Sequence, residues 1–159
     1  MRPGRRKINQ MRIDINKIIS VLPQRYPFIL IDRVLDYVPD EQITAVKNVS
    51  VSDPWMAGHF PGNPVMPGVL ILEAMCQAGG VLVNLSGDKG AKYLAGLDKV
   101  RFRKRVIPGD QLVIHGRVIK KKLNMIKMEV SATVDGALVA EAQIMASIGD
   151  KNDTSDSDS

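Results

Sequence analysis

The sequence predicts an α+β fold in which one antiparallel sheet wraps a single long helix. Three observations lead to this prediction. Residues 67–85 form an apolar run of helical length, six other stretches have strand character, and the chain has only three Phe, three Tyr and one Trp. Val and Ile therefore have to fill much of the core, and these residues favour strands. At 159 residues the chain is long enough to bury one core and fits one domain.

A short helix is expected first, over residues 14–22. Asp14 can cap its start by accepting hydrogen bonds from backbone amides. Four apolar residues then fall on one helix face: Ile15, Ile18, Ile19 and Leu22. The Tyr26-Pro27 step ends the helical segment, because the residue before a proline disfavours helical backbone angles.

Strands are expected on both sides of the long helix. An early pair covers residues 29–38 and 42–51, joined by a turn at Pro39-Asp40-Glu41. Four more strands follow the helix, over residues 92–102, 111–121, 125–134 and 138–148. Asp135-Gly136 is a strong hairpin signal between the last two. A sheet curled around one helix leaves an exposed edge strand, which favours edge-to-edge pairing of two copies.

Alternation of apolar and polar residues over 126–131 indicates that one face of the sheet is dry and the other is wet. The helix at 67–85 is barely long enough to span a membrane and contains Glu73 and Gln77, so we expect a buried core helix and no membrane insertion.

The two ends differ from the folded middle in composition. Residues 1–12 are basic and predict a flexible arm, whereas residues 13–149 contain the expected domain. Residues 150–159 contain only Asp, Ser, Asn, Thr and Lys and predict a disordered polar tail. Residues 13–22 are interrupted by polar side chains and lack the continuous apolar core of a signal peptide, so a cytoplasmic location is expected.

Charge and cysteine content limit the possible functions. The net charge of +5 is concentrated in basic clusters that suit an acidic partner. Phe102 is the only aromatic residue between Arg101 and Lys122, which argues against nucleic-acid binding, since such surfaces usually contain several aromatic side chains. One cysteine, Cys76, excludes an internal disulfide, and two histidines with one thiol argue against a zinc site.

Candidate acid and base residues flank the start of the long helix. His59 lies in the turn-rich segment Gly58-His59-Phe60-Pro61-Gly62, where a neutral imidazole can serve as a general base. Glu73 follows in the second helical turn among apolar residues, which favour the neutral carboxyl group and hence an acid. Such a pair across an apolar slot suits removal of a C–H proton coupled to departure of a hydroxyl group.

Pro67-Gly68 marks the start of the helix, where unpaired backbone amides can stabilise a carbonyl oxygen that acquires negative charge. Gln77 lies one turn after Glu73 on the same helix face. A single loop histidine is more often structural than catalytic, and it is the combination with this helix start that favours an enzyme.

Two other reactive side chains are interpreted as structural. The negative charge of Glu73 would raise the pKa of the Cys76 thiol, so packing is favoured over nucleophilic catalysis. His115 falls in an expected strand without a neighbouring carboxylate, and a solvated or core histidine is the simpler interpretation.

The segment from His59 to Gln77 closely resembles the (3R)-hydroxyacyl-[acyl-carrier-protein] dehydratases of the FabZ type. The shared residues are His59-Phe60-Pro61-Gly62, Pro67-Gly68-Val69-Leu70, Glu73-Ala74 and Gln77. The similarity continues through residues 22–28, 32–34, 97–102, 106–110 and 134–136, and thus covers roughly residues 13–148. Two positions depart from the family pattern, because Gln24 replaces a usual His and Arg105 replaces a usual Pro.

The resemblance implies a hot-dog fold, with a dimer as the catalytic unit and a trimer of dimers as the assembly. It also implies that His59 of one subunit and Glu73 of the other face a shared tunnel. His59 would take the proton α to the thioester carbonyl, and Glu73 would assist departure of the β-hydroxyl as water. Whether Glu73 donates directly or His59 shuttles the proton in a one-base elimination stays open.

The remaining roles follow from the same resemblance. Gln77 would orient the Glu73 carboxyl, and the Gly68 amide would hold the thioester oxygen. Tyr93 aligns with a tunnel-gating tyrosine, with strand packing as the alternative. The substrate would arrive on the phosphopantetheine of acyl carrier protein, with no other cofactor, in fatty acid and lipid A biosynthesis. Four basic residues, or a subset of them, would dock this acidic partner: Arg101, Arg103, Lys104 and Arg105.

Three alternatives are kept. One is an acyl thioesterase on the same fold, in which a carboxylate activates water. A second is a related dehydratase that also isomerises the double bond, which is disfavoured because such enzymes carry Asp at the position of Glu73. The third is a non-catalytic module that only binds acyl carriers.

Overall fold

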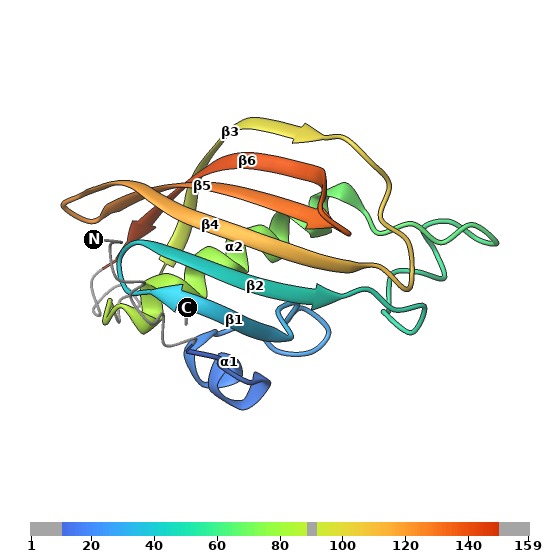
Figure 1. Ribbon diagram of the computed structural model, residues 1–159, viewed down its shortest axis with the longest axis horizontal. Helices are drawn as coiled ribbons and strands as arrows, with labels where there is room; N and C mark the ends of the chain where they lie inside the picture. Colours follow the sequence, from blue (N-terminus) through green and yellow to red (C-terminus); the bar gives the residue numbers. More distant parts are fainter. Residues whose placement is uncertain (1–10, 89–91, 150–159) are drawn as a thin grey trace, which may run out of the picture.

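A six-stranded antiparallel sheet curves around the long helix α2 (Gly68–Leu85), as Figure 1 shows. The structure, a computed structural model, describes residues 11–88 and 92–149. The strands are β1 (Arg33–Val38), β2 (Gln42–Asn48), β3 (Lys92–Phe102), β4 (Gln111–Lys122), β5 (Met125–Val134) and β6 (Ala137–Ile148). Their order in the sheet is β1-β2-β4-β5-β6-β3, so β1 and β3 are the edges. The predicted α+β architecture is confirmed.

The core lies between α2 and the concave face of the sheet and is mostly aliphatic. Five α2 residues are buried with 0% exposure: Ala74, Met75, Ala78, Val81 and Leu82. On β5, alternate residues Ile126, Met128, Val130 and Ala132 are buried, which confirms the predicted alternation. Glycines let the two layers approach closely, because a Cβ on Gly79 would lie 3.1 Å from the Met128 sulfur.

Among the described residues, α2 is the helix whose length and composition would allow a membrane span. Half of its apolar window is buried within the fold, and the sheet covers it. Its position is therefore that of the core helix expected from the sequence.

The short helix α1 (Ile15–Val21) begins at the predicted cap. The Asp14 carboxylate accepts from the amides of Asn16 and Lys17 at 3.0 and 3.2 Å. The prediction of a four-residue apolar face is only half right. Ile18 and Leu22 are buried, but Ile15 and Ile19 are 37% and 36% exposed, because this short helix contacts the core along a narrow line.

The first two strands are shorter than expected. Residues 29–32 are not in a strand, since the Leu30 amide and the Phe28 carbonyl bond to the Gln77 side chain. β2 ends at Asn48, after which Val49 exchanges backbone hydrogen bonds with Gly109 and Asp110.

The last four strands match their predicted ranges within one residue. Asp135 and Gly136 both have positive φ, 49° and 79°, as the two-residue hairpin turn requires. The expected polar tail lies outside the described residues, as does the expected basic arm except for its last two residues.

Replacing Leu82 by alanine should destabilise the protein by about 2–5 kcal/mol, because it removes buried methyl groups and leaves a cavity beside the sheet. Leu82 is 0% exposed on α2. Urea unfolding measures the change. Leu123→Ala is the matched control, since Leu123 is 91% exposed and the substitution should change stability by less than about 0.5 kcal/mol. Equal losses in both variants would contradict the burial of α2.

Candidate active site

The segment that carries His59 folds back on itself as a closed turn. The Val65 amide donates to the His59 carbonyl at 2.8 Å. Within this turn, Phe60 and Asn63 exchange two backbone hydrogen bonds of 3.0 and 2.9 Å. Gly62 has φ +73°, a left-handed conformation that glycine adopts without steric cost. The backbone around His59 is thus fixed by local hydrogen bonds.

The His59 imidazole is fixed by the same turn. Its Nδ1 lies 2.7 Å from the Val65 carbonyl oxygen, which can only accept a hydrogen bond. The Nδ1–H tautomer therefore satisfies this contact, and Nε2 keeps its lone pair. The ring also stacks on Phe60, with 4.1 Å between centroids. This arrangement leaves Nε2 available to accept a proton.

Glu73 is held by Gln77, one turn later on α2. The Gln77 amide nitrogen donates to Glu73 Oε1 at 2.9 Å and to the Phe28 carbonyl at 2.7 Å. Its side-chain oxygen accepts from the Leu30 amide at 2.8 Å. Gln77 is 2% exposed, and these partners satisfy both ends of its amide. Within the part of the chain that the structure describes, Oε1 is the Glu73 oxygen with a hydrogen-bond partner, which leaves Oε2 as the oxygen that can take part in proton transfer.

Glu73, Gln77 and Tyr93 line one cavity of about 540 Å³ between α2, the end of α1 and the sheet. Apolar side chains form much of its wall: Val21, Leu22, Val83, Leu94, Ile126, Met128 and Ile144. Three predicted site residues are thereby brought together. His59 is not among the residues that line this cavity, and within the described residues no hydrogen bond joins its side chain to Glu73.

Gly68 is the first residue of α2, with Pro67 as the N-cap. The Pro67 carbonyl accepts from the amides of Leu70 and Ile71 at 3.0 and 3.1 Å. Within the described residues, the Gly68 amide has no protein acceptor, as expected for a donor at a helix start. A Cβ on Gly68 would lie 3.2 Å from the Phe102 ring. Glycine therefore lets the Phe102 ring pack closely against the helix start, a reason that the sequence did not indicate.

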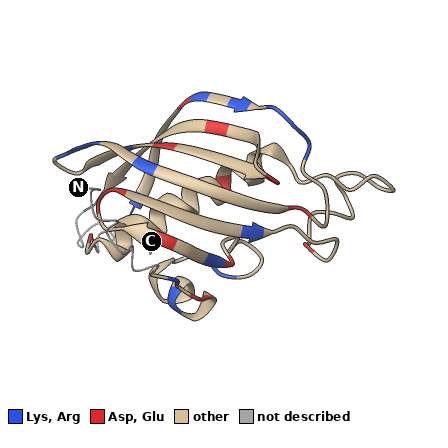
Figure 2. Cartoon of the chain, in the orientation of Figure 1, with Lys and Arg blue, Asp and Glu red and all other residues tan. Residues whose placement is uncertain are grey.

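The four predicted docking residues follow one another at the end of β3 and are all exposed. Figure 2 shows this as blue colouring along the end of β3 and the segment after it. Arg103 forms an ion pair with Glu141 at 2.5 Å, which partly neutralises it. Within the described residues, Arg101, Lys104 and Arg105 have no carboxylate partner, so they are the stronger candidates.

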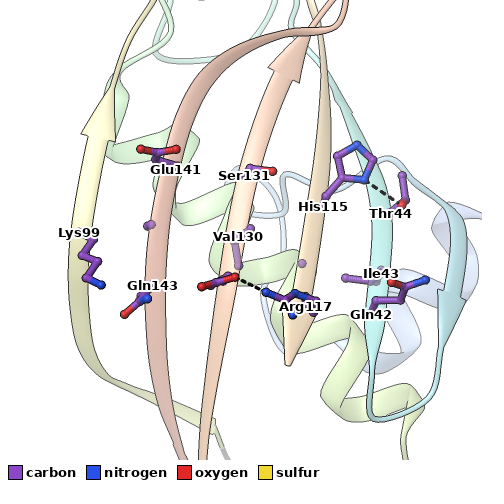
Figure 3. A pocket seen from close by; sticks show the side chains of 13 residues that line it. Gln42, Ile43, Thr44, Lys99, His115, Arg117, Val130, Ser131, Glu141 and Gln143 are labelled. Atoms are coloured by element: carbon purple, nitrogen blue, oxygen red, sulfur yellow. Dashed lines mark hydrogen bonds and ion pairs between the residues drawn. The ribbon is translucent and has the colours of Figure 1, made fainter. Parts of the chain in front are cut away.

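His115 lies on the outer face of the sheet, away from α2 (Figure 3). It is exposed and its Nδ1 is 3.1 Å from the Thr44 hydroxyl. A shallow pocket on this face is lined mainly by polar side chains, including the ion pair of Arg117 and Glu129 at 2.6 Å. The interpretation of His115 as a solvated histidine agrees with this position.

Gln24 is a cavity residue whose place near Glu73 the sequence did not indicate, because there it is only a departure from a family pattern. It lines the same cavity as Glu73. Its side-chain oxygen is buried and has no hydrogen-bond partner within the described residues. The unusual glutamine at this position was the available signal, but nothing local in the sequence placed it near Glu73.

Comparison with known proteins identifies similar sequences and similar folds. Residues 22–143 match the model of the FabA-like domain. The 3-hydroxyacyl-[acyl-carrier-protein] dehydratase FabZ of Oleidesulfovibrio alaskensis is 54% identical over 145 residues, covering 89% of this chain and 94% of that protein. The protein of the same description from Nitratidesulfovibrio vulgaris is 51% identical over 148 residues, covering 91% and 96%.

Among solved structures, the dehydratase heterocomplex ApeI:P from Xenorhabdus doucetiae is similar in fold, with a TM-score of 0.74. The sequence identity is 20%, and the match covers 84% of this chain and 91% of that one.

Cys76 also lines the cavity, and burial raises the pKa of its thiol to about 12, with a further increase from the charge of Glu73. We expect alkylation by iodoacetamide at pH 8 to be about a thousandfold slower than for a thiol at the ordinary pKa of 9.0, because the thiolate reacts. Mass spectrometry of the native protein measures the rate, with urea-unfolded protein as the control. Equal rates in both states would contradict the buried thiol.

Proposed function

Because this chain belongs to the FabA-like family, with close relatives of the FabZ type, we propose that His59 and Glu73 perform the dehydration for which those relatives are named. The enzyme is a hydro-lyase that converts 3-hydroxyacyl-[acyl-carrier-protein] to the enoyl thioester in fatty acid biosynthesis. The observation that carries the residue assignment is the Glu73 carboxyl, held by Gln77 in an apolar cavity.

The two groups divide the proton transfers. His59 Nε2 takes the proton from the carbon α to the thioester, and the electron pair of that C–H bond forms the new double bond. The bond from the β-carbon to its hydroxyl breaks, and Glu73 Oε2 gives its proton to the departing oxygen, which leaves as water. The imidazolium and the carboxylate then exchange a proton through water, which restores both groups.

The Gly68 amide is proposed to bind the thioester oxygen as negative charge develops on it. An amide at the N-terminus of an 18-residue helix offers both an unused N–H and the positive end of the helix dipole. Neither proton transfer requires a redox group, so we propose that the substrate's phosphopantetheine is the only prosthetic group involved.

The complete site is proposed to form between two protomers. His59 does not line the cavity of Glu73 in its own chain, and the edge strand β3 exposes large apolar side chains. These are Tyr93, Leu94, Leu97 and Phe102, between 40% and 56% exposed. Pairing of two β3 edges would bury them and allow His59 of one protomer to face Glu73 of the other. Tyr93, on this strand and in the cavity, is proposed to control tunnel access.

The proposal extends to the assembly of the protein and to its location in the cell. Related enzymes with this fold act on carrier-bound acyl chains as oligomers, and we propose a trimer of dimers for this chain. A fatty acid biosynthetic enzyme of this kind is proposed to act in the cytoplasm. Its acidic carrier protein would approach Arg101, Lys104 and Arg105.

His59→Ala and Glu73→Gln should each lower kcat by about 10²–10⁴-fold, because each removes one proton-transfer group. The absorbance of the enoyl thioester formed from 3-hydroxybutyryl carrier protein measures the rate. His115→Ala is the matched control and should retain wild-type activity. Full activity in both site variants would refute the assignment, whereas release of free thiol would identify a thioesterase.

Mixing the two inactive variants tests whether the site is shared. After random re-pairing, half of the dimers are mixed and contain one intact site, so about one quarter of wild-type activity should return. Activity that stays at the level of the single variants after verified subunit exchange would place both residues in one chain.

Reversing the charges of Lys104 and Arg105 to glutamate should raise KM for the acyl carrier protein about tenfold, with kcat unchanged, because steering toward an acidic surface is lost. The difference should shrink at high salt. Lys120→Glu, at the opposite end of the sheet, is the control and should leave KM unchanged. A pantetheine thioester without carrier protein should react equally with all variants; a loss there would contradict a docking role.

A further inference from the structure

Lys47 is a buried lysine near the end of β2, with 5% of its surface exposed. Its ammonium group donates to both carboxylate oxygens of Asp53 at 3.2 Å each and to the Asn48 carbonyl at 2.8 Å. Three acceptor oxygens thus surround an ammonium group that has three N–H donors. The Trp55 ring lies 5.6 Å away, within the range of a cation–π interaction. The charge is thus fully accommodated inside the protein.

The Lys47–Asp53 pair joins β2 to the irregular segment that leads to His59. Figure 1 shows this segment between β2 and α2. Asp53 also accepts from the Ser50 amide at 3.0 Å, and its own amide donates to the Ser50 carbonyl at 3.0 Å. In the next turn the Met56 amide donates a hydrogen bond to the Asp53 carbonyl at 3.1 Å. In the turn after that, the His59 amide donates to the Met56 carbonyl at 3.4 Å. Successive turns therefore connect Asp53 to His59.

Stability alone does not account for a charged pair at this place. Apolar side chains of similar size often stabilise a protein as well as a buried ion pair does. An ion pair with several hydrogen bonds differs in that it fixes direction as well as distance. A base carried on a loop needs such fixation, since a misplacement of about 1 Å can lower a rate by about 10²-fold.

Taking the proposed role of His59 as given, we infer that Lys47 and Asp53 are positioning residues for its imidazole. They act through the two turns between Asp53 and His59 and do not contact the substrate. The pair holds the start of the segment, while Met56, 1% exposed, holds its middle in the core.

The double variant Lys47→Met/Asp53→Leu leaves no unpaired buried charge, so its loss of stability is limited to the backbone partners of the pair, the Ser50 amide and the Asn48 carbonyl. We expect a thermal midpoint lowered by only a few degrees, kcat lowered about 10²-fold and KM changed less than about twofold. The single variant Lys47→Arg keeps the positive charge and the N–H donors opposite Asp53, so its kcat should be much closer to that of the wild type than the kcat of the double variant. The control Arg117→Met/Glu129→Leu removes an exposed ion pair on the outer face and should leave kcat unchanged.

A second readout does not depend on activity. The chain has two histidines, so ¹⁵N NMR of labelled histidine distinguishes them after assignment with His115→Asn. In the wild type, His59 should show the Nδ1–H tautomer bonded to the Val65 carbonyl. In the double variant this signal should broaden or shift towards the tautomer average of a free imidazole.

The outcomes distinguish this inference from the proposed function. Wild-type activity in His59→Ala refutes the proposed catalytic role of His59. If His59→Ala is inactive while the double variant keeps both wild-type kcat and the His59 tautomer signal, only the positioning inference is overturned. If the double variant does not fold, Asp53→Asn is measured below its unfolding temperature: reduced kcat with a changed His59 signal supports the inference, and wild-type values of both overturn it.

Discussion

The burial of α2 inside the curved sheet is the constraint on which the other features depend. An apolar helix of 18 residues is stable in this protein because the curved sheet covers it, mainly through β2, β4, β5 and β6. A polar group on its covered side must find partners within the protein. Gln77 does so by bonding to the backbone of Phe28 and Leu30, and its remaining N–H then reaches Glu73. The interaction that satisfies the core thus also orients the acid.

The acid and the base are held by different kinds of structure. Glu73 takes its position from a long core helix that is packed against the sheet, and Gln77 holds its carboxyl group. His59 takes its position from a chain of turns, in which each hydrogen bond is weak alone. Local closure by Val65 orients the ring, and the buried Lys47–Asp53 pair ties the segment to β2. A site composed in this way has one half set by packing and the other by directional polar contacts.

The sequence predicted features that depend on neighbouring residues. Strand β5 follows from its own alternation, and the turn at Asp135-Gly136 follows from backbone preferences of those two residues. The absence of strand structure at residues 29–32 was not predictable, because the Leu30 amide bonds to the side chain of Gln77, 47 residues further along the chain. In the site, motif similarity indicated His59 and Glu73. Lys47 gave no signal, since a lysine in an alternating strand normally faces water.

The edge strand β3 is not a flat ribbon. Its pairing with β6 shifts register twice, and Lys99 adopts φ +50° at the second shift, between Asp98 and Arg101. Flat edges recruit further chains without limit, whereas kinked and charged edges admit only a strand with a matching offset. The opposite edge is partly covered, since Ile13 bridges to Val34 on β1. Both edges of the sheet thus disfavour unlimited strand addition, which lowers the tendency of an aliphatic β protein to form fibres.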